Sequence, residues 1–304
     1  MSKGVGNGDR KASPQISVST VVTDGASFRR GLEMIAQAGA TAVEPAYIDG
    51  YMPFDETTFS ERNGNALAAA AADAGLALRA LSAHMDLGRA ESAGKLLRRL
   101  DFAAAAGASI LISNATTLER RATFEALLGG VLDAFASTGV TLAIENPGHG
   151  ADALLPTGQE SARIVAAIAH PNLRLNYDIG NALTYGGRKT DALDDLKAAL
   201  PFSAHIHLKD VRESGADWVY CPIGEGVVNY NDEVFGAIRE AGIPVGIEHP
   251  IRLRRPGRGD PVRQARAPSS SEVVAAVRRS LGFVRTHLAR PDIQVSSPDG
   301  PSRQ

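Results

Sequence analysis

Acidic and imidazole side chains end four consecutive apolar segments in the second half of the chain. Glu145 ends LAIE, Asp178 ends LNYD, His207 lies in AHIHLKD and Glu248 ends VGIE. Each follows several apolar residues, as at the carboxyl end of a strand buried in a parallel sheet. If the segments are neighbouring strands of one sheet, these four side chains meet at its edge.

Three carboxylates that meet in a buried site repel one another unless a counter-charge or bound protons neutralise them. One divalent cation removes the repulsion, and a mixed carboxylate and imidazole set suits Mn²⁺, Co²⁺, Fe²⁺, Mg²⁺ or Zn²⁺. A single acidic residue at a strand end can equally cap a helix, but four in succession favour a metal site. We therefore predict that Glu145, Asp178, His207 and Glu248 bind one divalent metal ion, with Mn²⁺ as first choice.

Short apolar runs alternate with longer helical patterns and must position these residues. We expect strands at about 16–22, 42–48, 77–85, 109–114, 141–146, 173–179, 202–209 and 245–249. Helices are expected at 27–38, 66–74, 92–106, 122–138 and 231–241, each followed by a glycine suited to a left-handed helix end. Eight such units predict a single (β/α)₈ TIM barrel, with its active site at the carboxyl ends of the strands.

An open, doubly wound sheet is the alternative architecture. The residues after the first strand, VVTDGAS, lack the G-x-G-x-x-G phosphate loop that such sheets often carry. The number of units also matches the closure of a barrel, so we prefer the barrel.

Composition narrows the class of protein further. The chain has 304 residues, 44% of them hydrophobic, and a formal net charge of −2, which gives no general attraction to nucleic acid or membranes. No apolar run approaches the ~20 residues of a membrane span, and the amino terminus lacks the apolar core of a secretory signal. One cysteine, Cys221, excludes an internal disulfide. We expect a cytoplasmic protein with a catalytic domain at 15–290 and disordered segments at 1–14 and 291–304.

Five segments together resemble the xylose-isomerase-like barrel superfamily over nearly the whole chain: AIENPG, LNYDIGN, HIHLKDV, PIGEGVVNYNDEVFGAI and GIEHP. This superfamily contains sugar-phosphate isomerases and epimerases, ketose 3-epimerases, hydroxypyruvate isomerases, inosose dehydratases, 3-dehydroshikimate dehydratases and endonuclease IV. The resemblance places Glu145, Asp178, His207 and Glu248 at the metal ligands of the family. It also implies that Glu145 and Glu248 are the acid/base pair, which moves a proton next to a carbonyl through a cis-enediolate.

Two departures from the family pattern narrow the choice of activity. Asn181 replaces the histidine of the common D-x-x-H motif, which argues against a trinuclear site of the endonuclease IV type. The best-known ketose 3-epimerases carry an arginine six residues after the metal histidine, and this chain has Glu213 there, beside Arg212. A free ketose is therefore a less favoured substrate.

Polar residues near other predicted strand ends are candidates for binding the substrate: Glu44, His84, Asn114, Asn181, Lys209 and Arg252. Glu44 can bind a hydroxyl or cap a loop, and His84 can shuttle protons or be structural. Lys209 can neutralise a substrate oxyanion or pair with a carboxylate at the barrel mouth. Arg252 begins a basic stretch over 252–266, which we interpret as a solvated insertion or a subunit contact, although its first arginine can bind an anionic group.

The leading hypothesis is a metal-dependent isomerase or epimerase of a small sugar or sugar derivative. The alternative is a dehydratase of a keto-polyol, of the inosose or dehydroshikimate type, or a subunit of an enzyme that cleaves C-glycosides. An endonuclease IV-type phosphodiesterase and a barrel without catalytic activity rank below these. We expect a small-molecule substrate and no nucleic-acid or membrane partner. The sequence does not determine the oligomeric state, and a homo-oligomer is compatible with it.

Overall fold

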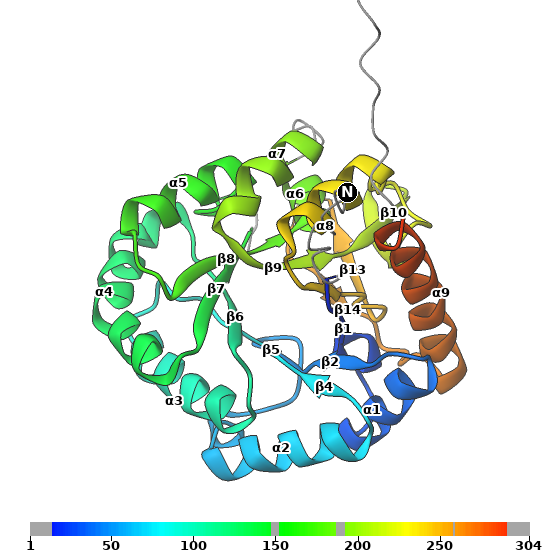
Figure 1. The fold of residues 1–304 in the computed structure, drawn as a ribbon, viewed down its shortest axis with the longest axis horizontal. Coiled ribbons are helices and arrows are strands. Elements are labelled where there is room, and N and C mark those ends of the chain that lie inside the picture. The colour runs from blue at the N-terminus through cyan, green and yellow to red at the C-terminus, as the bar shows by residue number, and fades with distance from the viewer. Residues whose placement is uncertain (1–13, 147–151, 187–191, 258, 291–304) are drawn as a thin grey trace, which may run out of the picture.

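A curled parallel sheet, surrounded by helices, forms the centre of the molecule in the computed structural model, which describes residues 14–146, 152–186, 192–257 and 259–290 (Figure 1). The sheet has ten strands in the order β3-β5-β6-β7-β8-β9-β12-β1-β2-β4. Their bounds are β1 Ile16–Ser19, β2 Ala42–Glu44, β3 Ala46–Ile48, β4 Ala77–Leu78, β5 Ala80–His84, β6 Ile110–Asn114, β7 Thr141–Glu145, β8 Leu173–Asp178, β9 Ser203–Leu208 and β12 Val245–Ile247. The expected disordered segments lie outside the described residues, except for Pro14.

The α-helices lie outside this sheet and cover it with their apolar faces (Figure 1). They are α1 Phe28–Gln37, α2 Glu61–Asp73, α3 Ser92–Ala105, α4 Arg121–Thr138, α5 Gly158–Ile168, α6 Ile179–Gly186, α7 Ala192–Ala199, α8 Asp232–Ala241 and α9 Ser270–Leu288. Short 3₁₀ helices are η1 Thr20–Thr23, η2 Glu56–Thr58, η3 Leu118–Arg120 and η4 Leu200–Phe202. This alternation of parallel strands and outer helices is consistent with a TIM barrel.

The strand positions expected from the sequence agree with the structure to within a few residues, and two differences have local causes. The first strand ends at Ser19, whose side chain accepts a hydrogen bond from the amide of Val21 and so starts η1. Helix α2 begins five residues earlier than expected, because Ser60 accepts a hydrogen bond from the amide of Asn63 and caps it. Glycines follow the expected helix ends, with left-handed backbones at Gly139 (φ 72°) and Gly242 (φ 69°).

Chain continuity from β2 to β3 and from β4 to β5 joins the two ends of the sheet. Strand β2 pairs with β4, and β3 pairs with β5, all in parallel. Only Pro45 separates β2 from β3, and only Arg79 separates β4 from β5. Proline has no amide hydrogen to donate to the ladder, which accounts for the break at Pro45.

A second sheet, antiparallel and four-stranded, is absent from the sequence-based prediction. It comprises β10 Asp210–Ser214, β11 Asp217–Cys221, β13 Leu253–Pro256 and β14 Val262–Arg263, in the order β10-β11-β13-β14. The basic stretch 252–266, interpreted above as a solvated insertion, therefore contains two strands. In β13 the side chains of Leu253 and Arg255 are buried, whereas that of Arg254 is exposed, as expected when successive strand residues face opposite sides.

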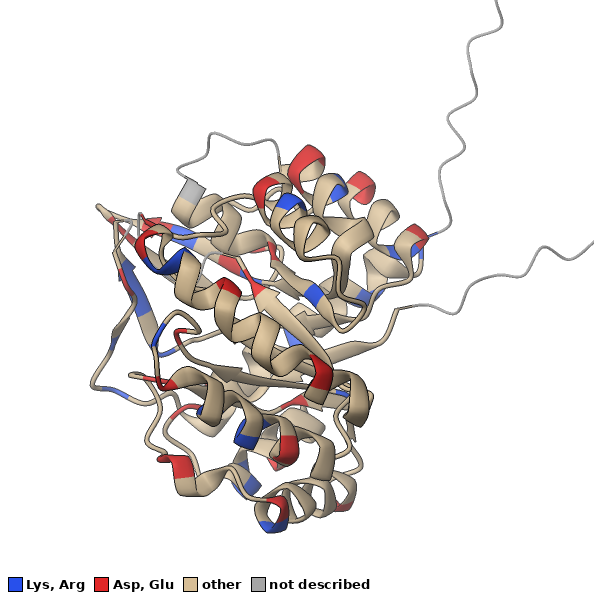
Figure 2. Ribbon diagram, turned by 90° about the vertical axis from the view of Figure 1, so that its left-hand side faces the viewer, with Lys and Arg blue, Asp and Glu red and all other residues tan. Residues whose placement is uncertain are grey.

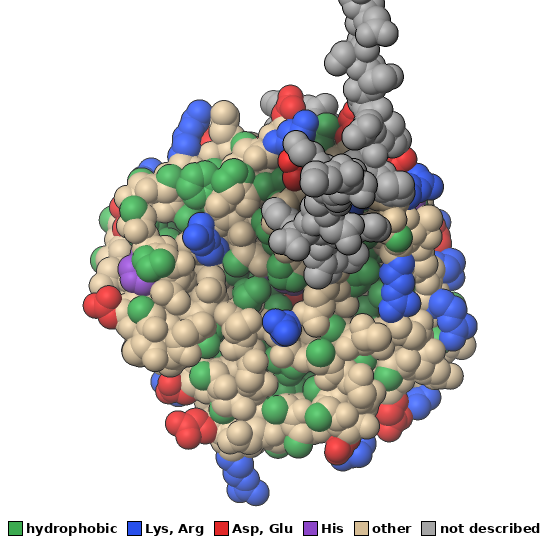
Figure 3. Space-filling view, in the orientation of Figure 1, with side chains coloured by type: hydrophobic (Ala, Val, Ile, Leu, Met, Phe, Trp, Pro, Cys, Tyr) green, Lys and Arg blue, Asp and Glu red, His purple; other side chains and the backbone are tan. Residues whose placement is uncertain are grey.

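Charged residues lie mainly on the outer helices and loops, with few on the strands (Figure 2). On the face seen in Figure 3, acidic and basic side chains are interspersed around the rim and form no continuous basic surface. None of the described helices combines the length and apolar character needed to cross a membrane.

Close packing of α2 on α3 gives a first prediction. An added Cβ at Gly64 would lie 2.5 Å from the carbonyl oxygen of Phe102, whereas one at Gly129 on α4 meets nothing within 4 Å. We expect Gly64→Ala to lower the free energy of unfolding by about 1–3 kcal/mol. The control, Gly129→Ala, should raise it by about 0.5–1 kcal/mol, because alanine favours a helix. Urea titrations of both variants measure the changes, and equal stability of the two would contradict the α2–α3 packing.

Candidate metal centre

His207 lies at the centre of the four residues predicted to bind a metal. Its Nδ1 is 3.0 Å from Oε2 of Glu145, 3.4 Å from Oε2 of Glu248 and 3.8 Å from Oδ2 of Asp178. One ligand atom from each of the four lies within 4.8 Å of the others, and all four residues are buried. The structure thus brings together four side chains that are up to 103 positions apart, the span from Glu145 to Glu248.

Strand register explains why these side chains meet. Asp178 on β8 is directly opposite His207 on β9, and Glu145 ends β7, which pairs with β8. Glu248 follows β12, whose Gly246 is opposite His207. Because all these strands are parallel, their carboxyl ends lie at one end of the curled sheet.

Lys209 supplies a positive charge next to two of the three carboxylates. Its Nζ is 2.7 Å from Oδ2 of Asp178, contacts Oε2 of Glu248, and donates a hydrogen bond to Oδ1 of Asn181 at 3.1 Å. Of the two roles that the sequence left open for Lys209, these contacts match the pairing with a carboxylate. Once the carboxylates are ionised and the imidazole is neutral, as metal ligands must be, three carboxylates and one ammonium leave two negative charges, which one divalent cation would balance.

The donor atoms fit a divalent metal ion. Oδ2 of Asp178 and Oε2 of Glu248 are buried and share a single cationic neighbour among the lysines, the ammonium of Lys209. Three buried carboxylates with one ammonium among them are unfavourable unless a further cation or bound protons compensate their charge. Carboxylate oxygens with one imidazole nitrogen are a set that Mn²⁺, Mg²⁺, Co²⁺, Fe²⁺ and Zn²⁺ all accept. Glu145, Asp178, His207 and Glu248 are therefore the residues that can hold it.

Glu44 is buried next to His207, on the side of the ring away from the other three carboxylates. Its Oε1 is 2.9 Å from Nε2 of His207 and accepts a hydrogen bond from Ser82 at 2.7 Å, and the residue is fully buried. This differs from the expected contact with a substrate hydroxyl, because β2 ends at Glu44 with the carboxylate directed into the interior of the sheet. A carboxylate on the far nitrogen of a metal-binding histidine fixes the orientation and tautomer of its ring.

The space that Glu44 occupies depends on the missing side chain of Gly246. A Cβ there would lie 2.7 Å from Oε2 of Glu44, 2.7 Å from Cε1 of His205 and 3.1 Å from Cδ2 of His207. His205 faces the same side as His207, one layer deeper, as the two-residue alternation predicts. Glycine at position 246 thus allows two histidines and a carboxylate to pack against one strand.

Sequence reasoning missed Asn176. Its Nδ2 donates to Oε2 of Glu145 at 2.8 Å and is 3.0 Å from Nδ1 of His207, while its Oδ1 is 2.9 Å from Nδ1 of His205. Asn176 lies two residues before Asp178 on β8, so strand alternation places both on the same face. That spacing was the available signal.

Asn181 contacts the carboxylates more closely than the expected substrate role suggests. Its Nδ2 donates to Oε1 of Glu145 at 2.8 Å, and its backbone amide donates to Oδ1 of Asp178 at 2.7 Å. These bonds, with those of Asn176, hold both oxygens of Glu145. The residue also lines the pocket described next, so a substrate contact stays a prediction.

A pocket opens above the carboxylates and contains most of the predicted substrate-binding residues. It is lined by Ile48, Tyr51, His84, Asn114, Glu145, Asn181, Tyr185, Lys209, Tyr220, Glu248, Pro250, Leu253, Arg255 and Pro261. His84 is 2.9 Å from Asn114 through Nδ1, and its Nε2 is 3.8 Å from Oε2 of Glu145. The lining of this pocket combines hydrogen-bonding groups with tyrosine side chains.

Arg252 does not line this pocket, in contrast to the expectation. It donates hydrogen bonds to the carbonyl oxygens of Gln264 and Ala265, both at 2.8 Å, and so holds the following chain in place. Arg255, three residues later, is buried and lines the pocket instead. Arg255 faces the pocket because it lies on the buried side of β13, where successive residues alternate between the two faces. Proximity to Glu248 in the sequence does not determine which arginine faces inward.

Electrostatic coupling sets the protonation of the cluster. Burial by itself would lower the pKa of His207, but Glu44, Glu248 and Glu145 hold it well above its ordinary value. Burial would raise the pKa of Glu44, and the two histidines His207 and His205 outweigh it and lower the pKa to about 2. Burial raises the pKa of Asp178 to about 7 despite the nearby ammonium of Lys209.

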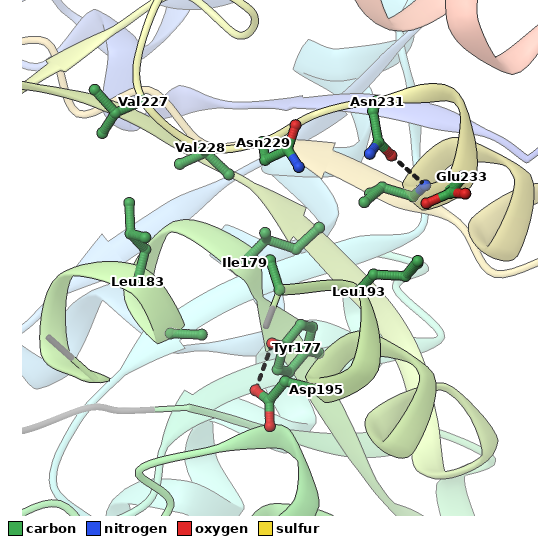
Figure 4. Close-up of a pocket in the computed structure, with 13 residues that line it drawn as sticks. Tyr177, Ile179, Leu183, Leu193, Asp195, Val227, Val228, Asn229, Asn231 and Glu233 are labelled. Carbon is green, nitrogen blue, oxygen red and sulfur yellow. Dashed lines mark hydrogen bonds between the residues drawn. The ribbon is translucent and has the colours of Figure 1, made fainter. Parts of the chain in front are cut away.

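A second cavity, of about 260 Å³, lies outside the sheet between α6, α7 and the start of α8 (Figure 4). Tyr177 and Asp195 face each other there, and the tyrosine hydroxyl donates a hydrogen bond of 2.6 Å to the carboxylate. The amides of Gly158 and Gln159 also donate to Asp195, so this carboxylate stabilises the start of α5. The cavity holds no cluster of metal-binding side chains among the described residues.

Comparison with known proteins identifies the family. The profile of the xylose isomerase-like TIM barrel family matches residues 32–272, which is most of the chain. The chain therefore belongs to this family, as its sequence motifs indicated. A search of the curated proteins finds no significant match.

Solved structures share the fold at low sequence identity. A D-psicose 3-epimerase with D-fructose is 16% identical, with a TM-score of 0.69 over 91% of this chain and 100% of that one. The IOLI protein with a bound zinc atom is 17% identical, with a TM-score of 0.69 over 91% and 100%. The probable 3-DHS dehydratase AsbF of Bacillus anthracis is 15% identical, with a TM-score of 0.64 over 87% and 97%. At these identities the likeness establishes the common fold.

The contact between Glu44 and His207 gives a second prediction. We expect Glu44→Gln to weaken Mn²⁺ binding about 10–100-fold, because a neutral amide holds the imidazole less firmly and leaves Nδ1 a poorer donor. Titration calorimetry of the metal-free variant measures the change. Glu33→Gln, at an exposed glutamate on α1, is the control and should leave affinity unchanged. Unchanged affinity in Glu44→Gln would show that Glu44 does not support a ligand.

Protonation of His207 and Asp178 gives a third prediction. In the metal-free chain both raised pKa values favour bound protons, and a metal ion must displace them. The stabilisation of His207 by its proton is present at low pH and disappears as pH rises through the raised pKa. We therefore expect the increase in Tm on adding Mn²⁺ to be small at pH 6 and larger at pH 8. An increase independent of pH would contradict proton displacement.

Proposed function

We propose that this chain is a divalent-metal-dependent isomerase or epimerase of a small sugar or sugar derivative. The observation that carries the proposal is the convergence of Glu145, Asp178, His207 and Glu248 in a buried site beneath a polar pocket. The family and the enzymes among its solved neighbours support it. The substrate we propose is a small molecule, with no nucleic-acid or membrane partner.

We assign the proton transfer to Glu145 and Glu248, which both line the pocket. The pKa of each is lowered, since interactions with His84 and His207 outweigh burial at Glu145, and interactions with Lys209 and His207 do so at Glu248. Both are thus carboxylates at neutral pH and can accept a proton from a carbon next to a carbonyl. A bound divalent ion would polarise that carbonyl and stabilise the negative charge that develops.

The remaining pocket residues bind and orient the substrate in this proposal. His84, Asn114 and Asn181 offer hydrogen-bonding groups to hydroxyls, and the ammonium of Lys209 faces the carboxylates from the same pocket. Asn176 and Glu44 hold the carboxylate of Glu145 and the ring of His207 in fixed positions. We propose Mn²⁺ as the preferred ion.

We also propose that the ten short parallel strands correspond to the eight strands of a (β/α)₈ barrel. Strands β2 and β3 then form one barrel strand that is interrupted at Pro45, and β4 and β5 form another that is interrupted at Arg79. The parallel pairings of β2 with β4 and of β3 with β5 support closure.

A dehydratase of a keto-polyol is the second candidate, because its chemistry begins with the same proton abstraction. Its support is the structural likeness to the probable 3-DHS dehydratase AsbF. Elimination of water creates a conjugated enone that absorbs in the ultraviolet, whereas isomerisation exchanges the α-proton with solvent without such a chromophore. A subunit that cleaves C-glycosides shares this chemistry and ranks below these two.

Exchange in D₂O tests the proposed function. We expect the purified chain to contain about one divalent metal ion and to incorporate deuterium next to the carbonyl of a ketose or keto-polyol substrate. A Glu145→Ala/Asp178→Ala variant should lose the metal, as measured by elemental analysis. A chain that binds no metal even after addition of Mn²⁺ would contradict the proposal, and two or three ions per chain would favour a phosphodiesterase.

Glu248→Gln provides the fourth prediction. Removing this carboxylate base should reduce the rate of α-proton exchange with D₂O about 10²–10⁴-fold. Nuclear magnetic resonance measures that rate from the loss of the α-proton signal. The matched control, Glu119→Gln at an exposed residue of η3, should retain full activity. Full activity of both variants would remove Glu248 from the catalytic pair.

A further inference from the structure

Arg255 differs from the other described arginines of the basic stretch 252–266. Arg254 pairs with Asp217, Arg263 pairs with Asp24 at 2.6 Å, and Arg266 pairs with Glu272 at 2.9 Å. Arg252 also lies 3.8 Å from Asp24. Within the described part of the chain, no aspartate or glutamate forms an ion pair with Arg255, which is only 2% exposed.

The contacts of Arg255 fix its position but leave its charge uncompensated. Its guanidinium carbon lies 3.7 Å from the centroid of the Tyr185 ring, a cation–π contact that orients the group. Nη1 donates to the carbonyl oxygen of Gly259 at 3.3 Å, and Nη2 to the hydroxyl of Tyr220 at 3.5 Å. Nε is buried and has no hydrogen-bond partner among the described residues. Buried arginines normally require a counter-ion.

The pocket places this guanidinium beside the candidate metal centre. Arg255 lines the same pocket as Glu145, Glu248 and Lys209, and it lies on β13 of the antiparallel sheet. Lys209 already pairs with Asp178 and Glu248, so its charge is balanced by the protein. Arg255 is therefore the cation of the pocket that a ligand can neutralise.

We propose that Arg255 binds a carboxylate of the substrate, so that the substrate is a polyhydroxy keto acid and not a neutral sugar. This inference rests on the proposed function. A guanidinium matches a carboxylate in geometry, and one arginine balances one negative charge. A phosphate dianion would need further cationic or amide donors, and the described lining around Arg255 offers tyrosine hydroxyls instead. The hydroxyl and carbonyl groups of the same molecule would then face Glu145 and Glu248.

D-Glucose and two anionic derivatives with the same ring test the proposal. Calorimetry on the Mn²⁺-loaded chain compares D-glucuronate, D-glucose 6-phosphate and D-glucose. We expect D-glucuronate to bind at least about 10-fold more tightly than D-glucose, because its carboxylate forms charge-assisted hydrogen bonds with the guanidinium. Arg255→Gln should abolish this preference, whereas Arg255→Lys, which keeps the charge, should retain part of it. The control, Arg254→Gln on the exposed side of the same strand, should retain all of it.

Other results would overturn the proposal. These are equal binding of the three compounds, no binding of any of them, a preference for D-glucuronate that survives Arg255→Gln, or tighter binding of the 6-phosphate that depends on Arg255. Mn²⁺ content, measured for every variant, separates this proposal from the proposed function. A chain that holds Mn²⁺ without a preference for carboxylate overturns only the inference about Arg255, whereas a chain without Mn²⁺ overturns both.

Discussion

Repulsion among three buried carboxylates is the constraint on which the site depends. Glu145, Asp178 and Glu248 surround Nδ1 of His207 at distances of 3.0–3.8 Å. In surroundings of low polarity such charges are tolerated only with cations or protons nearby. The raised pKa of His207 and the position of Lys209 are two responses to this excess of negative charge, and burial, with the neighbouring glutamates, raises the pKa of Asp178.

The surrounding structure holds these groups where their repulsion would otherwise separate them. Parallel register places Asp178 opposite His207, and asparagine amides bind both oxygens of Glu145. Below them, Glu44 holds the second nitrogen of the imidazole. The ligand set is thus positioned before any ion arrives, which reduces the conformational entropy lost on binding.

Much of the fold and the four clustered residues could be predicted, because both follow from local patterns. Apolar runs with polar ends mark buried parallel strands, and glycines mark the helix ends. The antiparallel sheet was not predictable in the same way, because β13 alternates buried and exposed residues within a segment rich in arginine. The same alternation determines that Arg255 and not Arg252 faces the pocket. Glu44 was placed at the right strand end, but its direction depends on contacts with residues 38 and 163 positions away.

Gly246 links positions that are far apart in the sequence and therefore restricts how this family member can diverge. Its absent side chain leaves the volume filled by Glu44, His205 and His207. A substitution at position 246 becomes tolerable only together with a smaller residue at position 44 or 205, so these positions should covary among relatives. Loss of the carboxylate at position 44 would then accompany a weaker hold on the histidine ring, and this single glycine can indicate which relatives keep a tightly oriented site.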